Sequence, residues 1–136
     1  MIKVALIGVG RTGSLVAKSV INSNMQLVAA FAAPGDSVVG QDVGILAGLQ
    51  KIGVNVSSAI DLAKILDACK PDVVVDFTVA NAFMQNLKTV AGKKVNMVVG
   101  TTGFTEQQLS EIKEVVRENN IGVVLSPNMS VGVNVF

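Results

Sequence analysis

The sequence has 136 residues, of which 50% are hydrophobic and 15% are charged, and this length suits one domain built around a single core. Its formal net charge of +1 gives no electrostatic reason to expect nucleic acid or a membrane surface as a partner. No apolar run reaches the roughly 18 residues that a transmembrane helix needs.

Cysteine and histidine usage narrows the chemistry further. The single cysteine, Cys69, cannot form a disulfide within the chain, which favours a reducing compartment and predicts a cytoplasmic location. The chain has no histidine, the commonest general acid–base and the commonest metal ligand, and it shows no metal-ligand spacing. We therefore expect no metal site.

The first third of the chain alternates between apolar runs and an amphipathic segment. Residues 2–8 form a continuous apolar run that ends in glycine, which predicts a buried strand, and residues 25–32 predict a second one. Between them, residues 12–23 predict a helix. The face of this helix expected to be buried holds Leu15, Val16, Ser19 and Val20. Residues 33–53 contain six glycine or proline residues and predict a loop with one helical turn.

The same alternation continues to the end of the chain. Further strands are predicted at 54–57, 72–77, 95–102 and 121–126. Helices are predicted at 58–70, 81–91 and 105–119. Thr105 and Gln108 match a capping box, which marks the start of the last helix. Strands that alternate with helices predict an α/β fold with one doubly wound parallel sheet and helices on both faces.

Three glycines follow the first predicted strand in the pattern G-x-G-x-x-G. In a Rossmann-like fold, Gly8 allows the tight turn, Gly10 lets a pyrophosphate approach the backbone, and Gly13 lets the helix pack closely on the strand. The free N–H groups at the helix start then face the phosphates, and Arg11 adds a cation. The pattern predicts a dinucleotide site, and the alternative is a tight turn with no ligand.

The end of the second predicted strand does not identify the dinucleotide. NAD-binding folds often place an Asp or Glu there to hold the ribose 2′-hydroxyl. Here the chain reads Ala32-Ala33-Pro34-Gly35-Asp36, so the acid comes a few residues late. We interpret Asp36 as a solvated turn residue, with a role in holding the ribose as the alternative. Because no Lys or Arg offers a partner for a 2′-phosphate, the choice between NAD and NADP stays open, with NAD favoured.

Two more segments follow predicted strands, at the edge of the sheet where ligands bind in such folds. They are "DFTVANA" at 76–82 and "GTTGFT" at 100–105. The second offers backbone N–H groups, two hydroxyls and little bulk, which suits the wall of a nicotinamide pocket. The alternative is a loop that only leads into the N-cap of the next helix.

Taken together, these motifs resemble a known family. "GVGRTG", "DFT", "VVGTTGF" and "SPNMSVGVNV" occur in the order and spacing found in the dihydrodipicolinate reductase family, and "GQDVGILAG" at 40–48 resembles another of its segments. Members of the family have two domains, are usually tetrameric and use NADH or NADPH. The resemblance implies a dinucleotide-binding domain at 1–129 and, at 130–136, the start of a hinge into a substrate domain that this chain lacks.

The resemblance also implies roles for individual residues. It places the cofactor against Gly8, Gly10, Arg11, Thr12, Gly13, Phe77, Thr78, Gly100, Thr101, Pro127, Asn128 and Met129. It places the substrate against Thr102 and Gly103. The family's catalytic segment lies further along the chain, so no catalytic residue is expected here and the chain alone is expected to be inactive. The implied reaction of the whole enzyme is hydride transfer to an unsaturated dihydrodipicolinate-type ring, in lysine and diaminopimelate biosynthesis.

Three positions depart from the family pattern. Ala32 and Ala33 stand where an acid and an arginine are often found, and Val79 stands where an arginine often follows "DFT". The cofactor domain of a related amino-acid or diamino-acid dehydrogenase would fit these changes, and a non-catalytic NAD(H)-binding module is a further alternative. A small-molecule substrate is expected for the full enzyme, and a homo-oligomer is expected because apolar surface would otherwise be exposed.

Overall fold

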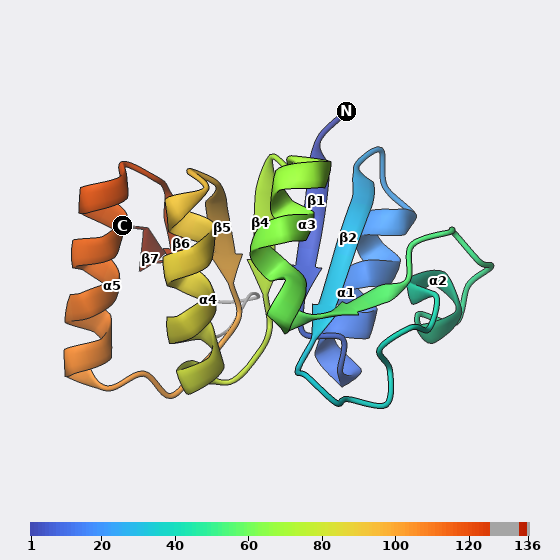
Figure 1. Cartoon of the computed structure of the whole chain (residues 1–136), viewed down its shortest axis with the longest axis horizontal. Helices are drawn as coiled ribbons and strands as arrows, with labels where there is room; N and C mark the ends of the chain where they lie inside the picture. The colour runs from blue at the N-terminus through green and yellow to red at the C-terminus, as the bar shows by residue number, and fades with distance from the viewer. Residues whose placement is uncertain (126–133, 136) are drawn as a thin grey trace.

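The computed structural model describes residues 1–125 and 134–135, which form one seven-stranded sheet in the order β3-β2-β1-β4-β5-β6-β7 (Figure 1). The strands are β1 (Lys3–Ile7), β2 (Gln26–Ala32), β3 (Val56–Ser58), β4 (Val73–Asp76), β5 (Asn96–Val99), β6 (Val123–Leu125) and β7 (Asn134–Val135). The first six pair in parallel. This confirms the doubly wound, Rossmann-like sheet, with the strand order reversing direction beside β1.

The last strand departs from the prediction of a wholly parallel sheet. Strand β7 pairs antiparallel to β6, with Val124 opposite Val135 and Leu125 opposite Asn134. Only residues 126–133 connect the two strands. A parallel crossover needs a dozen or more residues, so a connection of this length joins antiparallel neighbours.

Helices cover both faces of the sheet, as predicted. They are α1 (Arg11–Ile21), α2 (Val43–Leu46), α3 (Leu62–Cys69), α4 (Ala80–Gly92) and α5 (Glu106–Asn119), with a 3₁₀ turn η1 (Ala59–Asp61) before α3. Figure 1 shows α3, α4 and α5 in front of the sheet and α1 behind it. The capping box of α5 is present, since Thr105 accepts a hydrogen bond from the Gln108 N–H and the Gln108 side chain accepts one from the Thr105 N–H. None of the described helices is long and apolar enough to cross a membrane.

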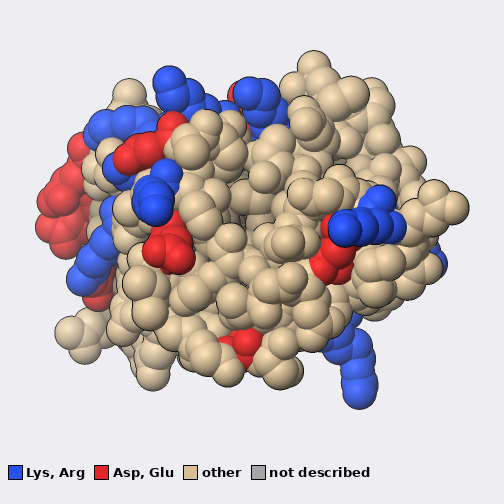
Figure 2. Space-filling model, turned by 45° about the vertical axis from the view of Figure 1, so that its right-hand side comes forward, with Lys and Arg blue, Asp and Glu red and all other residues tan. Residues whose placement is uncertain are grey.

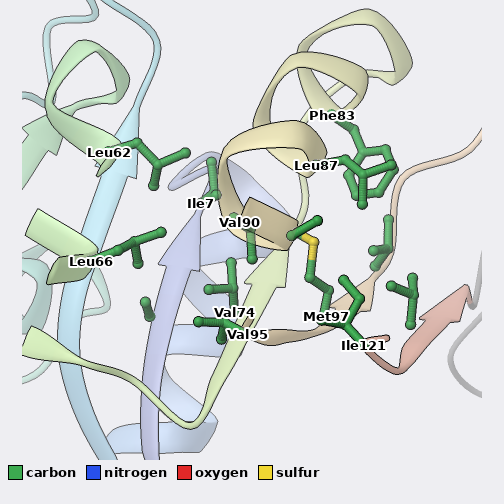
Figure 3. Packing of buried hydrophobic residues seen from close by; sticks show 14 of the residues in the cluster. Ile7, Leu62, Leu66, Val74, Phe83, Leu87, Val90, Val95, Met97 and Ile121 are labelled. Carbon is green, nitrogen blue, oxygen red and sulfur yellow. The ribbon is translucent and has the colours of Figure 1, made fainter. Parts of the chain in front are cut away.

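Two hydrophobic clusters, one on each face, hold the layers together. On the front face, Figure 3 shows Leu87 and Val90 of α4 beside Val74 of β4 and Met97 of β5, with Leu66 of α3 over β2 in the same cluster. These five side chains are at most 2% exposed. Full burial of one such side chain contributes about 1.5–3 kcal/mol to folding. The strands are apolar along their whole length because one hydrophobic cluster covers each face of the sheet.

The buried face of α1 differs from the predicted one. Gly13, Ala17 and Val20 are buried, whereas Leu15 is 63% exposed and Ser19 is also exposed. The prediction was wrong for Leu15 and Ser19 because the apolar pattern does not report how closely the helix approaches the strand. The close contact of the helix with the strand instead orients the helix so that the small residues at i and i+4 face the sheet.

The loop at 33–53 contains the predicted helical turn, α2, and is held by a buried carboxylate that the sequence analysis did not single out. One oxygen of Asp42 accepts hydrogen bonds from the backbone N–H groups of Gly44, Ile45 and Ile52, at 2.8, 3.4 and 3.1 Å, and the other accepts from Gly53 at 2.8 Å. Desolvation alone would raise the pKa of Asp42, but the four N–H donors outweigh it and lower the pKa below its ordinary value.

We expect the Asp42 carboxylate to stabilise the fold at neutral pH and to lose this effect in acid. Because its pKa is lower in the folded chain, its contribution is present above the ordinary carboxyl pKa and disappears as the pH falls through the folded-state value. The melting temperature of Asp42→Asn should therefore lie well below that of the parent at pH 7, with the gap narrowing below about pH 4. Asp36→Asn is the control, since Asp36 is exposed and, within the described part of the chain, accepts only one hydrogen bond, from the Val38 N–H. A gap that stays constant with pH would contradict this account.

Candidate functional site

The glycine loop follows β1 and opens α1, as the motif predicts. Gly8 has a φ of +96°, and its N–H donates to the carbonyl of Phe31 at 2.8 Å. Gly10 is the N-cap residue of α1, and no described side chain caps the helix there. An added Cβ at Gly10 would meet no described atom within 4 Å, so the space beside its backbone is open. The first-turn N–H groups of α1 are therefore available to an anion at this point.

A cleft of about 300 Å³ lies against this loop. Its walls come from residues 7–10 of the glycine loop, residues 32–34 after β2, and Thr78 and Val79 after β4. The side of α4 closes it with Ala82, Gln85 and Asn86. The cleft thus lies at the carboxyl ends of β1, β2 and β4, which is where open α/β sheets bind ligands.

The end of the cleft beside β2 is small and uncharged except for one residue. Ala32 is buried, Ala33 and Pro34 are exposed, and all three line the cleft. Asp36 also lines it, but its carboxylate accepts a hydrogen bond from the Val38 N–H at 3.0 Å and is exposed. This fits the prediction of a solvated turn residue. In Figure 2, charged side chains of both signs are interspersed around a largely uncharged central surface.

The segment after β4 lies between two glycines from other loops. A Cβ on Gly8 would approach the carbonyl carbon and oxygen of Phe77 to 2.9 Å. A Cβ on Gly100 would overlap the ring of Phe77, coming within 2.6 Å of Cδ1. The N–H of Phe77 donates to the Ile7 carbonyl, and the N–H of Gly100 donates to the Asp76 carbonyl. The absence of side chains at Gly8 and Gly100 therefore lets three strand ends approach one another.

A buried carboxylate joins these strand ends. Asp76, the last residue of β4, is 0% exposed. One of its oxygens accepts from the Thr78 N–H at 2.9 Å, from the Thr78 hydroxyl at 2.6 Å and from the Thr101 hydroxyl at 3.3 Å. The other accepts from the Asn86 amide at 3.2 Å. Burial raises the pKa of Asp76 above its ordinary value, and these hydrogen bonds oppose that rise.

The structure sorts the predicted site residues by position. The cleft is lined by Gly8, Gly10 and Thr78. Outside its lining, packed among the loops, lie Gly13, Phe77, Gly100 and Thr101. Exposed at the start of α1 or after β5 lie Arg11, Thr12, Thr102 and Gly103. Three predicted residues, Pro127, Asn128 and Met129, lie outside the described residues. The expected hinge at 130–136 does too, except for Asn134–Val135, which form β7.

Sequence reasoning placed Ala82 in a segment at the ligand-binding edge of the sheet but missed Gln85 and Asn86 of α4. Ala82, Gln85 and Asn86 line the cleft at helical spacing, i, i+3 and i+4. Gln85 is exposed and Asn86 is half-buried, next to the buried apolar face of α4, and adjacent polar residues at this boundary were a signal that was available. The role of Asp76 as a shared acceptor had no such signal, since its partner Thr101 is distant in the sequence.

The sheet order, the glycine loop and the cleft at the strand ends define a dinucleotide-binding domain of the Rossmann type. The chain belongs to the dihydrodipicolinate reductase family, because residues 2–129 match the family model described as "Dihydrodipicolinate reductase, N-terminus". This confirms the resemblance seen in the sequence motifs.

Curated relatives carry the same family name. The 4-hydroxy-tetrahydrodipicolinate reductase of Methanocaldococcus jannaschii is 49% identical over 138 residues, covering 100% of this chain and 50% of the relative. The enzyme of the same name from Methanothermobacter thermautotrophicus is 44% identical, with the same coverage. This chain therefore spans about half the length of the curated relatives it matches.

Solved structures agree on the fold. A dipicolinate-bound dihydrodipicolinate reductase from Paenisporosarcina matches 94% of this chain with a TM-score of 0.71 and 28% identity, over 48% of its own length. An amine dehydrogenase from Mycobacterium smegmatis matches 91% of this chain and 38% of its own, with a TM-score of 0.74 and 28% identity. At 18% identity, the scyllo-inositol dehydrogenase of Lactobacillus casei shows a shared fold alone.

Proposed function

We propose that this chain binds a nicotinamide dinucleotide for a reductase of the dihydrodipicolinate type. The observation that carries the proposal is the open space at Gly10, at the uncapped start of α1 and beside the 300 Å³ cleft. The first-turn N–H groups and Arg11 would hold the pyrophosphate there. The adenosine half would lie toward residues 32–36, and the nicotinamide half toward the loop after β5.

Gly10→Val tests this proposal directly. No described atom lies within 4 Å of the position of the new Cβ, so the folded chain should accommodate the side chain. The valine would occupy the space where a pyrophosphate approaches the backbone, and NADH affinity should fall at least tenfold, or about 1.4 kcal/mol. Nicotinamide fluorescence during NADH titration measures this, with little protein background because the chain has no Trp or Tyr.

Gly92→Val is the matched control. Gly92 ends α4, its added Cβ would also meet no described atom within 4 Å, and it does not line the cleft. Gly92→Val should bind NADH like the parent chain. Equal NADH affinity in the parent chain and Gly10→Val, with both folded by circular dichroism, would contradict the pyrophosphate site.

The preference between the two dinucleotides belongs to the same proposal. No lysine or arginine is present at 32–36, where a 2′-phosphate would need a cation, and Asp36 lines the cleft there. We expect NADH to bind more tightly than NADPH. Tighter NADPH binding would mean that another group, such as Arg11, holds the phosphate.

The proposed reaction belongs to the whole protein. Residues 1–129 would form the cofactor domain, and 130–136 would lead to a domain that holds a small-molecule substrate, near Thr102 and Gly103. When bound, the nicotinamide ring supplies a hydride to an unsaturated ring of the dihydrodipicolinate type, in lysine and diaminopimelate biosynthesis. Gly100 and Thr101 would shape the wall beside that ring, as would Pro127, Asn128 and Met129. We further propose a cytoplasmic homo-oligomer, which light scattering of the whole protein would test.

Two observations favour a second function, the cofactor domain of a related dehydrogenase. The amine dehydrogenase of Mycobacterium smegmatis matches this chain as well as the solved reductase does, at 28% identity. Ala32, Ala33 and Val79 also depart from the reductase pattern. The family model and the curated relatives favour the reductase. Activity of the whole protein on a dihydrodipicolinate-type substrate, compared with an amine or amino acid, would separate the two functions.

A further inference from the structure

The least expected polar group in the described chain is the carboxylate of Asp76. It is 0% exposed, so it cannot touch a ligand in the cleft. A buried carboxylate is costly unless donors surround it, and four donors surround this one. Because those donors belong to segments that border the cleft, the position of Asp76 at the end of β4 points to a role in the site as well as in stability.

The partners of Asp76 come from three separate elements. Thr78 belongs to the loop after β4, Thr101 to the loop after β5, and Asn86 to α4. The Thr101 hydroxyl lies 3.0 Å from the Thr78 carbonyl oxygen and 3.3 Å from the Asp76 carboxylate, so its single proton is shared between two acceptors. Thr101 is only 4% exposed, which means that its hydroxyl also serves the loops rather than solvent.

Both loops held by this carboxylate border the proposed dinucleotide site. Thr78 and Asn86 line the cleft itself. Thr101 directly precedes Thr102 and Gly103, which are exposed where the nicotinamide half is proposed to lie. A change at Asp76 would therefore shift the loop after β5 relative to the cleft, although no atom of Asp76 reaches the site.

We propose that Asp76 is a positioning residue that fixes the loop after β5 against the loop after β4 and so preforms the wall for the nicotinamide half of the dinucleotide. The proposal rests on the proposed function. The proposal predicts a difference between two ligands that loss of a purely structural carboxylate would not produce. Loss of Asp76 should weaken a ligand that carries the nicotinamide ring more than a ligand that ends at the second ribose.

NADH and ADP-ribose provide this comparison, because ADP-ribose keeps the adenosine, the pyrophosphate and a ribose but lacks the nicotinamide. We expect Asp76→Ala and Thr101→Val to weaken NADH about tenfold through loss of the preformed wall, while ADP-ribose affinity changes less than about twofold. Thr101→Ser keeps the hydroxyl and should restore most of the NADH affinity. Fluorescence titration measures NADH, and displacement calorimetry measures ADP-ribose.

Asp42→Ala is the matched control, since it also removes a buried carboxylate with four donors, here all backbone N–H groups, but lies outside the cleft lining. It should lower the melting temperature without changing the ratio of the two affinities. Equal losses for both ligands, or no loss of NADH affinity, in folded Asp76→Ala or Thr101→Val would overturn the proposal. If Asp76→Ala fails to fold by circular dichroism, the Thr101→Val and Thr101→Ser pair decides. Failure of the parent chain to bind either ligand would instead overturn the proposed function, and this inference with it.

Discussion

Gly13→Ala should destabilise the chain by about 3 kcal/mol, the upper range for overpacking in a tight site. The added Cβ would overlap the carbonyl oxygen of Gly8 and come within 2.8 Å of its carbonyl carbon. Both atoms belong to the backbone, so no side-chain rotation relieves the contact. Helix α1 would have to move away from β1, and the melting temperature should fall by about 10 °C.

Gly10→Ala separates this packing effect from the general cost of replacing a glycine. Gly10 lies three residues earlier in the same motif, but its added Cβ would meet no described atom within 4 Å. As the N-cap residue of α1 it should cost less than about 1 kcal/mol. Thermal melts of the two variants by circular dichroism would measure the difference. Similar melting temperatures would mean that α1 does not pack on the Gly8 carbonyl as described.

Gly100→Ala should destabilise the chain by about 2 kcal/mol, because its Cβ would overlap the Phe77 ring. This contact differs from that of Gly13, since a side chain rather than the backbone stands in the way. Phe77→Leu should therefore relieve it. In the double variant we expect a favourable coupling of about 1 kcal/mol, measured by urea denaturation of the parent, both single variants and the double variant.

Gly122→Ala is the corresponding control, since the nearest atom to its added Cβ would be the Asn96 side chain at 3.6 Å, an ordinary contact. It should change the free energy of unfolding by less than about 0.5 kcal/mol. If the losses in free energy of unfolding of Gly100→Ala and Phe77→Leu simply add up in the double variant, the two side chains do not compete for the same space.

Local patterns predicted most of the fold because they reflect local physics. An apolar run that ends in glycine marked β1, another apolar run marked β5, and Thr105 with Gln108 marked the start of α5. The face of α1 was missed because burial of Gly13 and Ala17 depends on how closely the helix approaches the sheet, which side-chain hydrophobicity does not report. The direction of β7 depends on the length of its connection rather than on its own residues.

The site was predictable in part for a similar reason. The glycine motif spans only six residues and each glycine has a local structural role, so the sequence indicated the position of the cleft. The hydrogen bond from Thr101 to Asp76 joins residues that are far apart in the sequence, and it exists only because β4 and β5 are neighbours in the sheet. The Asp42 carboxylate likewise binds backbone groups ten and eleven residues away in a loop without a period. Both carboxylates needed the three-dimensional arrangement to be recognised.

The β3 edge of the described sheet has a consequence for how sheets of two molecules could meet. The outermost strand on that side, β3, is three residues long. An edge strand offers unpaired N–H and C=O groups as a template for another chain, and a very short edge offers too few to hold one. Growth of the sheet across its β3 edge from one molecule into the next is therefore disfavoured.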